Sequence, residues 1–212
     1  MTKKLFHVDP YLKECDATVT KIQEKNVWLD KTIFFAFSGG QESDSGIINN
    51  IPVVEVKKEG KDIIHVLESN PDFSEGDSVK CVIDWDKRNS IMKLHTSAHI
   101  VYFFLVEKIG KIDMIGSNVT STKSRIDFNY DKSISEILPE LENKVNEFIS
   151  QSHKVETGED ENNKGRFWWN VEGIEKMPCG GTHIKNTTEI GKIKLKRKNI
   201  GAGKERIEIT LA

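Results

Sequence analysis

The hydrophobic pattern of the chain changes near residue 88, and this change constrains the fold more than any other feature. Before it, short apolar or alternating stretches rich in β-branched and aromatic residues are separated by turns with Gly, Asn or Asp. Such stretches predict the short strands of a small β-barrel or sandwich. The expected strands cover residues 18–22, 26–29, 32–37, 51–56, 62–67 and 79–84.

Beyond residue 88 the apolar residues recur at helical spacing. They predict a helix over about 91–109, for which Asn89-Ser90 offers a cap. A second helix is expected over roughly 136–152, with Ser133 and Glu136 as a capping box. Helices of this length indicate a domain different in kind from the N-terminal strands.

The remaining C-terminal segments complete an α+β pattern. A strand is expected around 125–128, and the polar, acidic segment 153–164 is interpreted as a surface loop. Two alternating runs, 191–197 and 205–210, predict a hairpin across the glycine turn at 201–203. Strands and helices in this order predict an α+β fold.

Length and composition allow two small domains. The chain has 212 residues, of which 30% are charged and 37% hydrophobic, as in a soluble globular protein. We therefore expect a β domain at 1–88 and an α+β domain at 89–212. The formal net charge is -2, so any surface for nucleic acid must be a local patch.

Targeting signals and a disulfide framework are not expected. The N-terminal residues lack the apolar core of a secretory signal, and no stretch approaches the roughly 18–20 apolar residues of a membrane helix. We therefore expect a cytoplasmic protein with no membrane segment. Three cysteines predict no disulfide framework, and Cys15 and Cys81 are expected to be buried and inert.

Two pairs of metal-binding residue types have the same spacing. His95 and His99 lie four positions apart on the expected helix and so project from one face. Cys179 and His183 enclose two glycines, which indicate a tight loop. Each pair alone could be two ordinary polar residues, but these two windows hold four of the chain's nine His and Cys residues. Together they predict one metal site, and imidazole with thiolate favours zinc.

The residue types leave the role of the zinc open. Structural zinc sites use mainly cysteines at short spacings, whereas this set is rich in histidine and draws on two distant segments. Such a set makes zinc a stronger Lewis acid, able to polarise a water molecule or a carbonyl.

These motifs resemble a known family. HTSAH at 95–99 and CGGTH at 179–183 are similar to the editing domain of alanyl-tRNA synthetase and to the free-standing AlaX-type editing proteins. The resemblance extends from about residue 34 to 208 and looks like the medium-length AlaX type. It includes FSGGQESDSG at 37–46, VIDWDKR at 82–88, TTEIG at 187–191 and GKERIE at 203–208.

The resemblance implies a function. It implies a small N-terminal β-barrel domain followed by a zinc-dependent editing domain like that of threonyl- and alanyl-tRNA synthetases. The enzyme would deacylate mischarged tRNA(Ala), chiefly Ser-tRNA(Ala), with Gly-tRNA(Ala) as a further candidate, and would spare Ala-tRNA(Ala). An alanine pocket rejects neither glycine nor serine strongly, so a second, hydrolytic site is needed. The expected cofactor is Zn²⁺ on His95, His99, Cys179 and His183, and the expected partner is the acceptor end of tRNA(Ala).

Further contacts are expected from weaker signals. The serine-sensing region of the family falls on 114–120, where Met114-Ile115 replace a polar residue. The candidate substrate contacts are Gln41, Asp44, Ser117, Thr120 and Thr182. The basic C-terminal run is either a solvated strand face or a phosphate-binding surface, for which the candidates are Lys196, Arg197, Lys204 and Arg206. Phe167-Trp168-Trp169 is more typical of core than of a base-stacking platform.

Two other functions stay open. The editing domain of threonyl-tRNA synthetase shares the two spacings, so another mischarged tRNA is a possible substrate. A tRNA-binding module with a purely structural zinc is the alternative from a different class.

Overall fold

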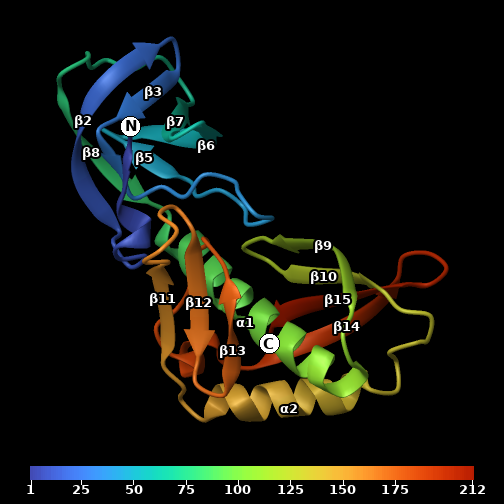
Figure 1. Cartoon of the computed structure of the whole chain (residues 1–212). Helices are drawn as coiled ribbons and strands as arrows, with labels where there is room; N and C mark the ends of the chain where they lie inside the picture. Colours follow the sequence, from blue (N-terminus) through green and yellow to red (C-terminus); the bar gives the residue numbers. More distant parts are fainter. The chain divides into compact units, whose positions relative to one another are not determined.

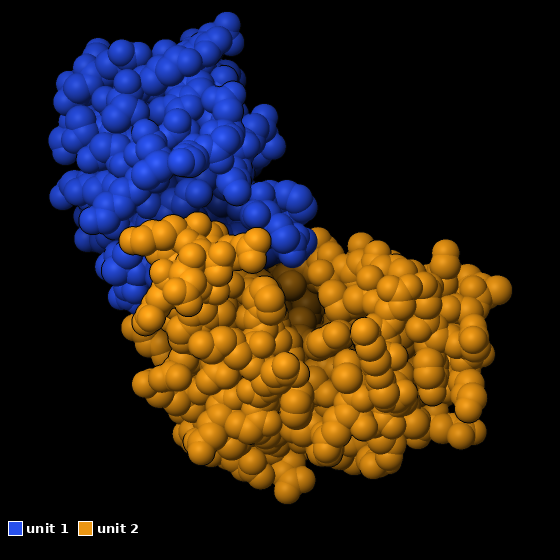
Figure 2. Space-filling view, in the orientation of Figure 1, with its two compact units in different colours: residues 1–89 blue, residues 90–212 orange.

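A computed structural model describes residues 1–212, and the chain divides into two compact units, 1–89 and 90–212 (Figure 2). The long helix α1 (Trp85–Ile109) begins in the first unit and continues in the second. The content is mixed α/β, as the sequence predicts. Neither α1 nor any other helix carries an apolar stretch sufficient to cross a bilayer.

Six strands of the first unit pair in a closed antiparallel ring in the order β2-β3-β7-β6-β5-β8 (Figure 1). Closure leaves none of these strands with an unpaired edge. Alternate side chains, such as Val27, Ile63 and Cys81, point inward and form the core. The strands are β2 (Glu14–Gln23), β3 (Asn26–Leu29), β5 (Gly46–Ile48), β6 (Ile51–Glu59), β7 (Asp62–Leu67) and β8 (Ser78–Ile83).

The expected strand at 32–37 is wrong for most of its length. Only Lys31–Thr32 forms a strand, β4, which pairs in parallel with β1 (Lys3–Lys4). The next four residues are buried without joining a ladder. Asp44 replaces the missing strand partner with both its side chain and its backbone: the Phe35 amide donates to Asp44 Oδ2 at 2.5 Å, and the Phe35 carbonyl accepts from the Asp44 amide at 3.0 Å.

A buried ion pair fixes the loop that follows. Arg88 is fully buried, and its guanidinium contacts both carboxylate oxygens of Asp44, with Nε 2.9 Å from Oδ1. The same guanidinium donates to the carbonyls of Pro10 at 2.9 Å and Ile33 at 2.7 Å. The first turn of α1 is therefore tied to the glycine-rich loop 37–46 within the first unit.

The start of α1 also differs from expectation. The helix begins at Trp85, six residues before the predicted start, so Asn89-Ser90 lies inside it. Asp84 supplies the cap, because its Oδ1 accepts from the Lys87 amide at 3.1 Å. The early start places Arg88 on the helix.

The second unit contains two antiparallel sheets. A four-stranded sheet has the order β14-β15-β10-β9, and a three-stranded sheet has the order β11-β12-β13 (Figure 1). The expected C-terminal hairpin is confirmed as β14 and β15. The strands are β9 (Asp113–Val119), β10 (Ser124–Asn129), β11 (Val155–Glu159), β12 (Phe167–Val171), β13 (Ile174–Pro178), β14 (Ile193–Asn199) and β15 (Lys204–Leu211).

Two local expectations in this unit are wrong. The second expected helix forms as α2 (Leu138–Ser150), but the capping box expected from Ser133 and Glu136 does not. The helix has Pro139 in its first turn and no side-chain cap, and the Ser133 hydroxyl donates to the Ser135 hydroxyl instead. The segment 153–164 is not wholly a loop, because its first half forms β11 and pairs with β12. Most side chains of β11 are exposed and polar, so the strand lacks the apolar alternation from which strands are predicted.

Candidate metal centre and adjoining pocket

The two pairs of His and Cys residues meet in the second unit. One donor atom from each of His95, His99, Cys179 and His183 lies within 4.8 Å of the others. Helix α1 places the imidazoles of His95 and His99 one turn apart, with ring centroids 5.1 Å apart. The glycine loop after β13 brings Cys179 Sγ to 3.5 Å from His95 Nε2 and 3.2 Å from His183 Nε2.

Burial sets the protonation of this cluster. It lowers the pKa of His99 to about 4 and holds the pKa values of His95 and His183 well below the usual range, with the neighbouring imidazoles adding to the effect. The neutral rings keep lone pairs for a metal ion. Burial raises the pKa of the Cys179 thiol to about 11, so a thiolate there requires a cation beside it.

One nitrogen of the cluster has no hydrogen-bond partner. His99 Nε2 is buried without one, while Nδ1 of the same ring lies 3.3 Å from Met177 Sδ. Trp169 stacks on the ring with centroids 4.7 Å apart and holds it in place. An unpaired buried nitrogen costs about 1–3 kcal/mol, and a metal ion would satisfy it. Three imidazoles and one thiol therefore fit a zinc site by number, type and placement.

Thr96 orients one of these ligands. Its Oγ1 donates to the Met92 carbonyl at 2.9 Å and lies 3.1 Å from His183 Nδ1. A hydroxyl has a single proton, so Thr96 Oγ1 must accept from Nδ1–H of His183. This contact selects the tautomer whose Nε2 lone pair faces Cys179. The motif comparison missed Thr96, although a threonine between two helical histidines commonly bonds the carbonyl four residues earlier.

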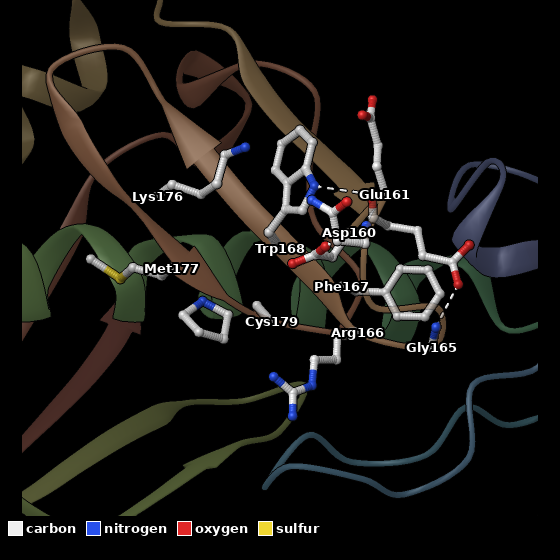
Figure 3. A pocket seen from close by; sticks show the side chains of 13 residues that line it. Asp160, Glu161, Gly165, Arg166, Phe167, Trp168, Lys176, Met177 and Cys179 are labelled. Atoms are coloured by element: carbon white, nitrogen blue, oxygen red, sulfur yellow. Dashed lines mark hydrogen bonds between the residues drawn. The ribbon is translucent and has the colours of Figure 1, made fainter.

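A pocket of about 970 Å³ opens beside the cluster (Figure 3). Cys179 and Gly180 form part of its wall, with Arg166, Phe167 and Lys176 among the other residues that line it. The Phe167 carbonyl accepts from the Cys179 amide at 2.9 Å, which fixes the wall of the pocket to the loop that carries Cys179.

The neighbouring tryptophans Trp168 and Trp169 point to opposite faces of β12, because side chains alternate along a strand. Trp169 is fully buried, as expected for core. Trp168 is partly exposed: its indole donates to the Glu159 carbonyl at 3.3 Å, and the Lys176 ammonium lies 3.9 Å above its ring. A side chain on Gly158 would collide with Trp168, since a Cβ there would lie 2.4 Å from the indole.

Comparison with known proteins identifies the family. The model of the tRNA synthetases class II (A) matches residues 3–87, and that of the threonyl and alanyl tRNA synthetase second additional domain matches 170–208. The alanyl-tRNA editing protein AlaX-M of Pyrococcus horikoshii is 36% identical, with 100% of this chain and 98% of that protein aligned. The chain belongs to the AlaX-type alanyl-tRNA editing proteins.

This chain is also similar to one part of alanine–tRNA ligases. Those of Methanococcus maripaludis and Pyrococcus furiosus are 36% and 35% identical to this AlaX-type chain. The alignments include 98% and 97% of the chain but only 26% and 25% of the ligases. The chain thus spans about a quarter of these ligases.

The candidate substrate residues of this AlaX-type protein lie in different settings. Gln41 and Asp44 are buried in the first unit, where Asp44 is the partner of Arg88. Ser117 is exposed on β9. Thr120 stabilises the turn before β10, where its Oγ1 accepts from the Lys123 amide at 3.2 Å. Thr182 is buried in the loop that carries Cys179 and His183.

The candidate tRNA-binding residues of the AlaX-type chain do not all lie on the same face of the four-stranded sheet, because side chains alternate along its strands. Register places Lys196 opposite Glu208, and Arg206 opposite Asp127. Arg197 lies on the other side of β14 and forms two hydrogen bonds with the Glu205 carboxylate, at 2.5 and 2.7 Å. Lys204 is exposed at the start of β15.

Replacing Thr96 by valine is expected to lower zinc affinity by about 10-fold or more, the usual cost of losing a group that orients a metal ligand. Valine has nearly the same shape but cannot accept from His183 Nδ1. Competition with a chromophoric chelator measures the affinity. Thr96→Ser keeps the hydroxyl and is the matched control. Equal affinities of the valine variant and the wild type would contradict this role.

Proposed function

We propose that this AlaX-type protein is a zinc-dependent deacylase of mischarged tRNA(Ala). Its chief substrate is Ser-tRNA(Ala), Gly-tRNA(Ala) is a further substrate, and Ala-tRNA(Ala) is spared. The observation that carries the proposal is a cluster of four partly or fully buried metal donors, in which His99 Nε2 has no other partner and Cys179 lines a large pocket. The relative from Pyrococcus horikoshii is named an alanyl-tRNA editing protein, which supports the choice of substrate.

His95, His99, Cys179 and His183 would hold the zinc. When bound, zinc supplies a Lewis acid that can polarise an ester carbonyl or a water molecule. The protein's own contribution is to exclude water from the cluster, to keep its imidazoles neutral and to position the acceptor end. The pocket beside Cys179 lies within the range of ordinary ligand sites, about 300–1,000 Å³. Phe167 offers an aromatic face on which a terminal base can stack.

Discrimination against alanine follows from hydrogen bonding. A site that binds the serine hydroxyl leaves its own polar groups unpaired when alanine enters. The contacts with substrate expected of Gln41, Asp44, Ser117, Thr120 and Thr182 stay predictions. We assign the deacylase chemistry to residues 90–212 and the role of an N-terminal accessory domain to residues 1–89.

Deacylation of Ser-tRNA(Ala) and Ala-tRNA(Ala) by the purified, zinc-loaded protein tests the proposal. We expect rapid release of serine and release of alanine at the spontaneous rate. Thr-charged tRNA(Thr) and Ser-charged tRNA(Thr) serve as controls for the other editing class. Release of serine only from Ser-tRNA(Thr) would show that the substrate is mischarged tRNA(Thr) and not mischarged tRNA(Ala). No release from any charged tRNA by a folded, zinc-loaded protein would leave a binding module.

A further inference from the structure

The four-stranded sheet of the second unit has one apolar face and one charged face. Ile126, Phe128 and Ile207 are buried on the first. Side chains alternate along strands, and directly paired residues share a face. The register places Lys198, Arg206 and Asp127 in one row and Lys196, Glu208 and Arg125 in the next. We call this surface the cationic sheet face; its cations are Lys123, Arg125, Lys194, Lys196, Lys198, Lys204 and Arg206.

The carboxylates of this face lie beneath its cations. The side chains of Asp127 and Glu208 are 8% and 9% exposed, whereas those of Arg206 and Lys198 are 25% and 46% exposed. Asp127 accepts from Arg206 Nε at 2.6 Å and Nη2 at 2.8 Å, and also contacts the Arg125 guanidinium. The acidic groups are therefore hidden from an approaching ligand, while the cations are exposed.

A second carboxylate repeats the arrangement. Glu208 accepts from Lys123 Nζ at 2.6 Å and lies 3.3 Å from Lys198 Nζ. The hydrogen bond from Lys123 and the nearby ammonium charges hold the pKa of Glu208 below its ordinary value, so this carboxylate stays ionised. At the margin, Glu142 of α2 pairs with Lys194 at 3.3 Å. With Asp113, which pairs with Asn129 on β10, four carboxylates face seven cations, which leaves a local positive excess in a chain of net charge -2.

Pre-ordered cations favour a rigid polyanion. Because Asp127 and Glu208 already fix four of the side chains, less side-chain entropy is lost when an anion binds. None of the chain's large exposed hydrophobic side chains lies on β10, β14 or β15, so these strands lack the apolar anchors typical of protein interfaces. Rows of Lys and Arg without such anchors are typical of surfaces that bind a phosphate backbone.

We propose that the cationic sheet face binds the phosphodiester backbone of RNA, and specifically of the tRNA substrate in so far as the proposed function holds. The binding is electrostatic and does not depend on base sequence. This assignment keeps Lys196, Lys204 and Arg206 from the sequence-based candidates and adds Lys123, Arg125, Lys194 and Lys198. Arg197 lies on the opposite face of the sheet.

The test is the salt dependence of binding to uncharged tRNA, measured by fluorescence anisotropy. The triple variant Lys123→Gln/Lys196→Gln/Lys198→Gln is expected to bind more weakly. The slope of log Kd against log salt should fall by about 1 for each lysine that contacts a phosphate. The matched control is Lys57→Gln/Lys61→Gln/Lys80→Gln, which also removes two paired lysines and one further exposed lysine. The control should bind like the wild type.

A second variant guards against misfolding, because the triple leaves Glu208 without its lysines. Lys194→Gln/Lys196→Gln keeps both buried carboxylates paired and should still reduce the slope. Unchanged slopes in both variants would overturn the proposal. Equally tight binding of poly-glutamate, with the same loss in the variants, would overturn the assignment to RNA. Wild-type binding without hydrolysis would refute the proposed function but leave this inference standing.

Discussion

Cys179→Ala protein is expected to lose its zinc and to hydrolyse Ser-tRNA(Ala) at least about 100-fold more slowly than the wild type. Losing a group that merely orients a ligand costs 10- to 100-fold in affinity or activity, so losing a direct donor should cost at least the upper value. The thiol lies 3.5 Å from His95 Nε2 and 3.2 Å from His183 Nε2 and is the one sulfur donor of the four-residue cluster.

Cys15→Ala is the matched control, because Cys15 is a partly buried thiol in the first unit, outside the cluster. It should keep both zinc and activity. Zinc content by atomic absorption and serine release are measured on the same samples, after denaturant unfolding has shown that each variant folds. A zinc-free Cys179→Ala protein with wild-type activity would show that the metal is not catalytic. A fully loaded variant would show that Cys179 is not a ligand.

Arg88→Met is expected to destabilise the first unit by about 3–5 kcal/mol, the range for removing one partner of a buried ion pair. The change leaves the Asp44 carboxylate uncompensated at 2% exposure and removes the donor from the Pro10 and Ile33 carbonyls. Asp44→Leu should destabilise the unit to a similar extent, because it leaves the buried Arg88 guanidinium without its carboxylate partner. Denaturant unfolding followed by circular dichroism measures the loss.

The matched control for the ion pair is Glu55→Gln, which breaks an exposed pair with Lys57 and should cost less than about 1 kcal/mol. The double variant Asp44→Leu/Arg88→Met should be less destabilised than the sum of the single variants, because neither charge is then left alone. A cost below about 1 kcal/mol for Arg88→Met would contradict the structural role given to the pair.

That the four candidate metal donors lie together could be predicted from sequence, because their spacing within each pair places both side chains at one site. A helix converts the separation of His95 and His99 into a shared face, and the two glycines between Cys179 and His183 indicate a tight loop. Sequence spacing does not predict the burial or the hydrogen-bond partners of the individual donor atoms. The unpaired Nε2 of His99 and the contact between Thr96 and His183 depend on which atoms are buried and which partners they meet.

The errors in the fold have a common physical origin. The strand expected at 32–37 and the helix start expected at 91 were both wrong because an aspartate outside the apolar pattern makes the deciding hydrogen bond. Asp44 bonds the Phe35 backbone in place of a strand, and Asp84 caps α1 where Asn89-Ser90 was expected to do so. Strand β11 was missed for the opposite reason, since its exposed polar residues carry no apolar alternation.

The basic C-terminal run shows the same limit for function. Its alternation predicts a hairpin, and the hairpin forms. Sequence alone does not show that Asp127 and Glu208 lie under the cations of one face, nor that Arg197 turns to Glu205 on the other. Cross-strand register decides which charges are exposed together.

Returning zinc to metal-stripped wild-type protein, while serine release from Ser-tRNA(Ala) is followed, tests the central claim most directly. We predict that the stripped protein releases serine at the spontaneous rate and that activity rises with bound zinc until the site is filled. Full activity in the folded, metal-free protein would contradict a catalytic metal on His95, His99, Cys179 and His183.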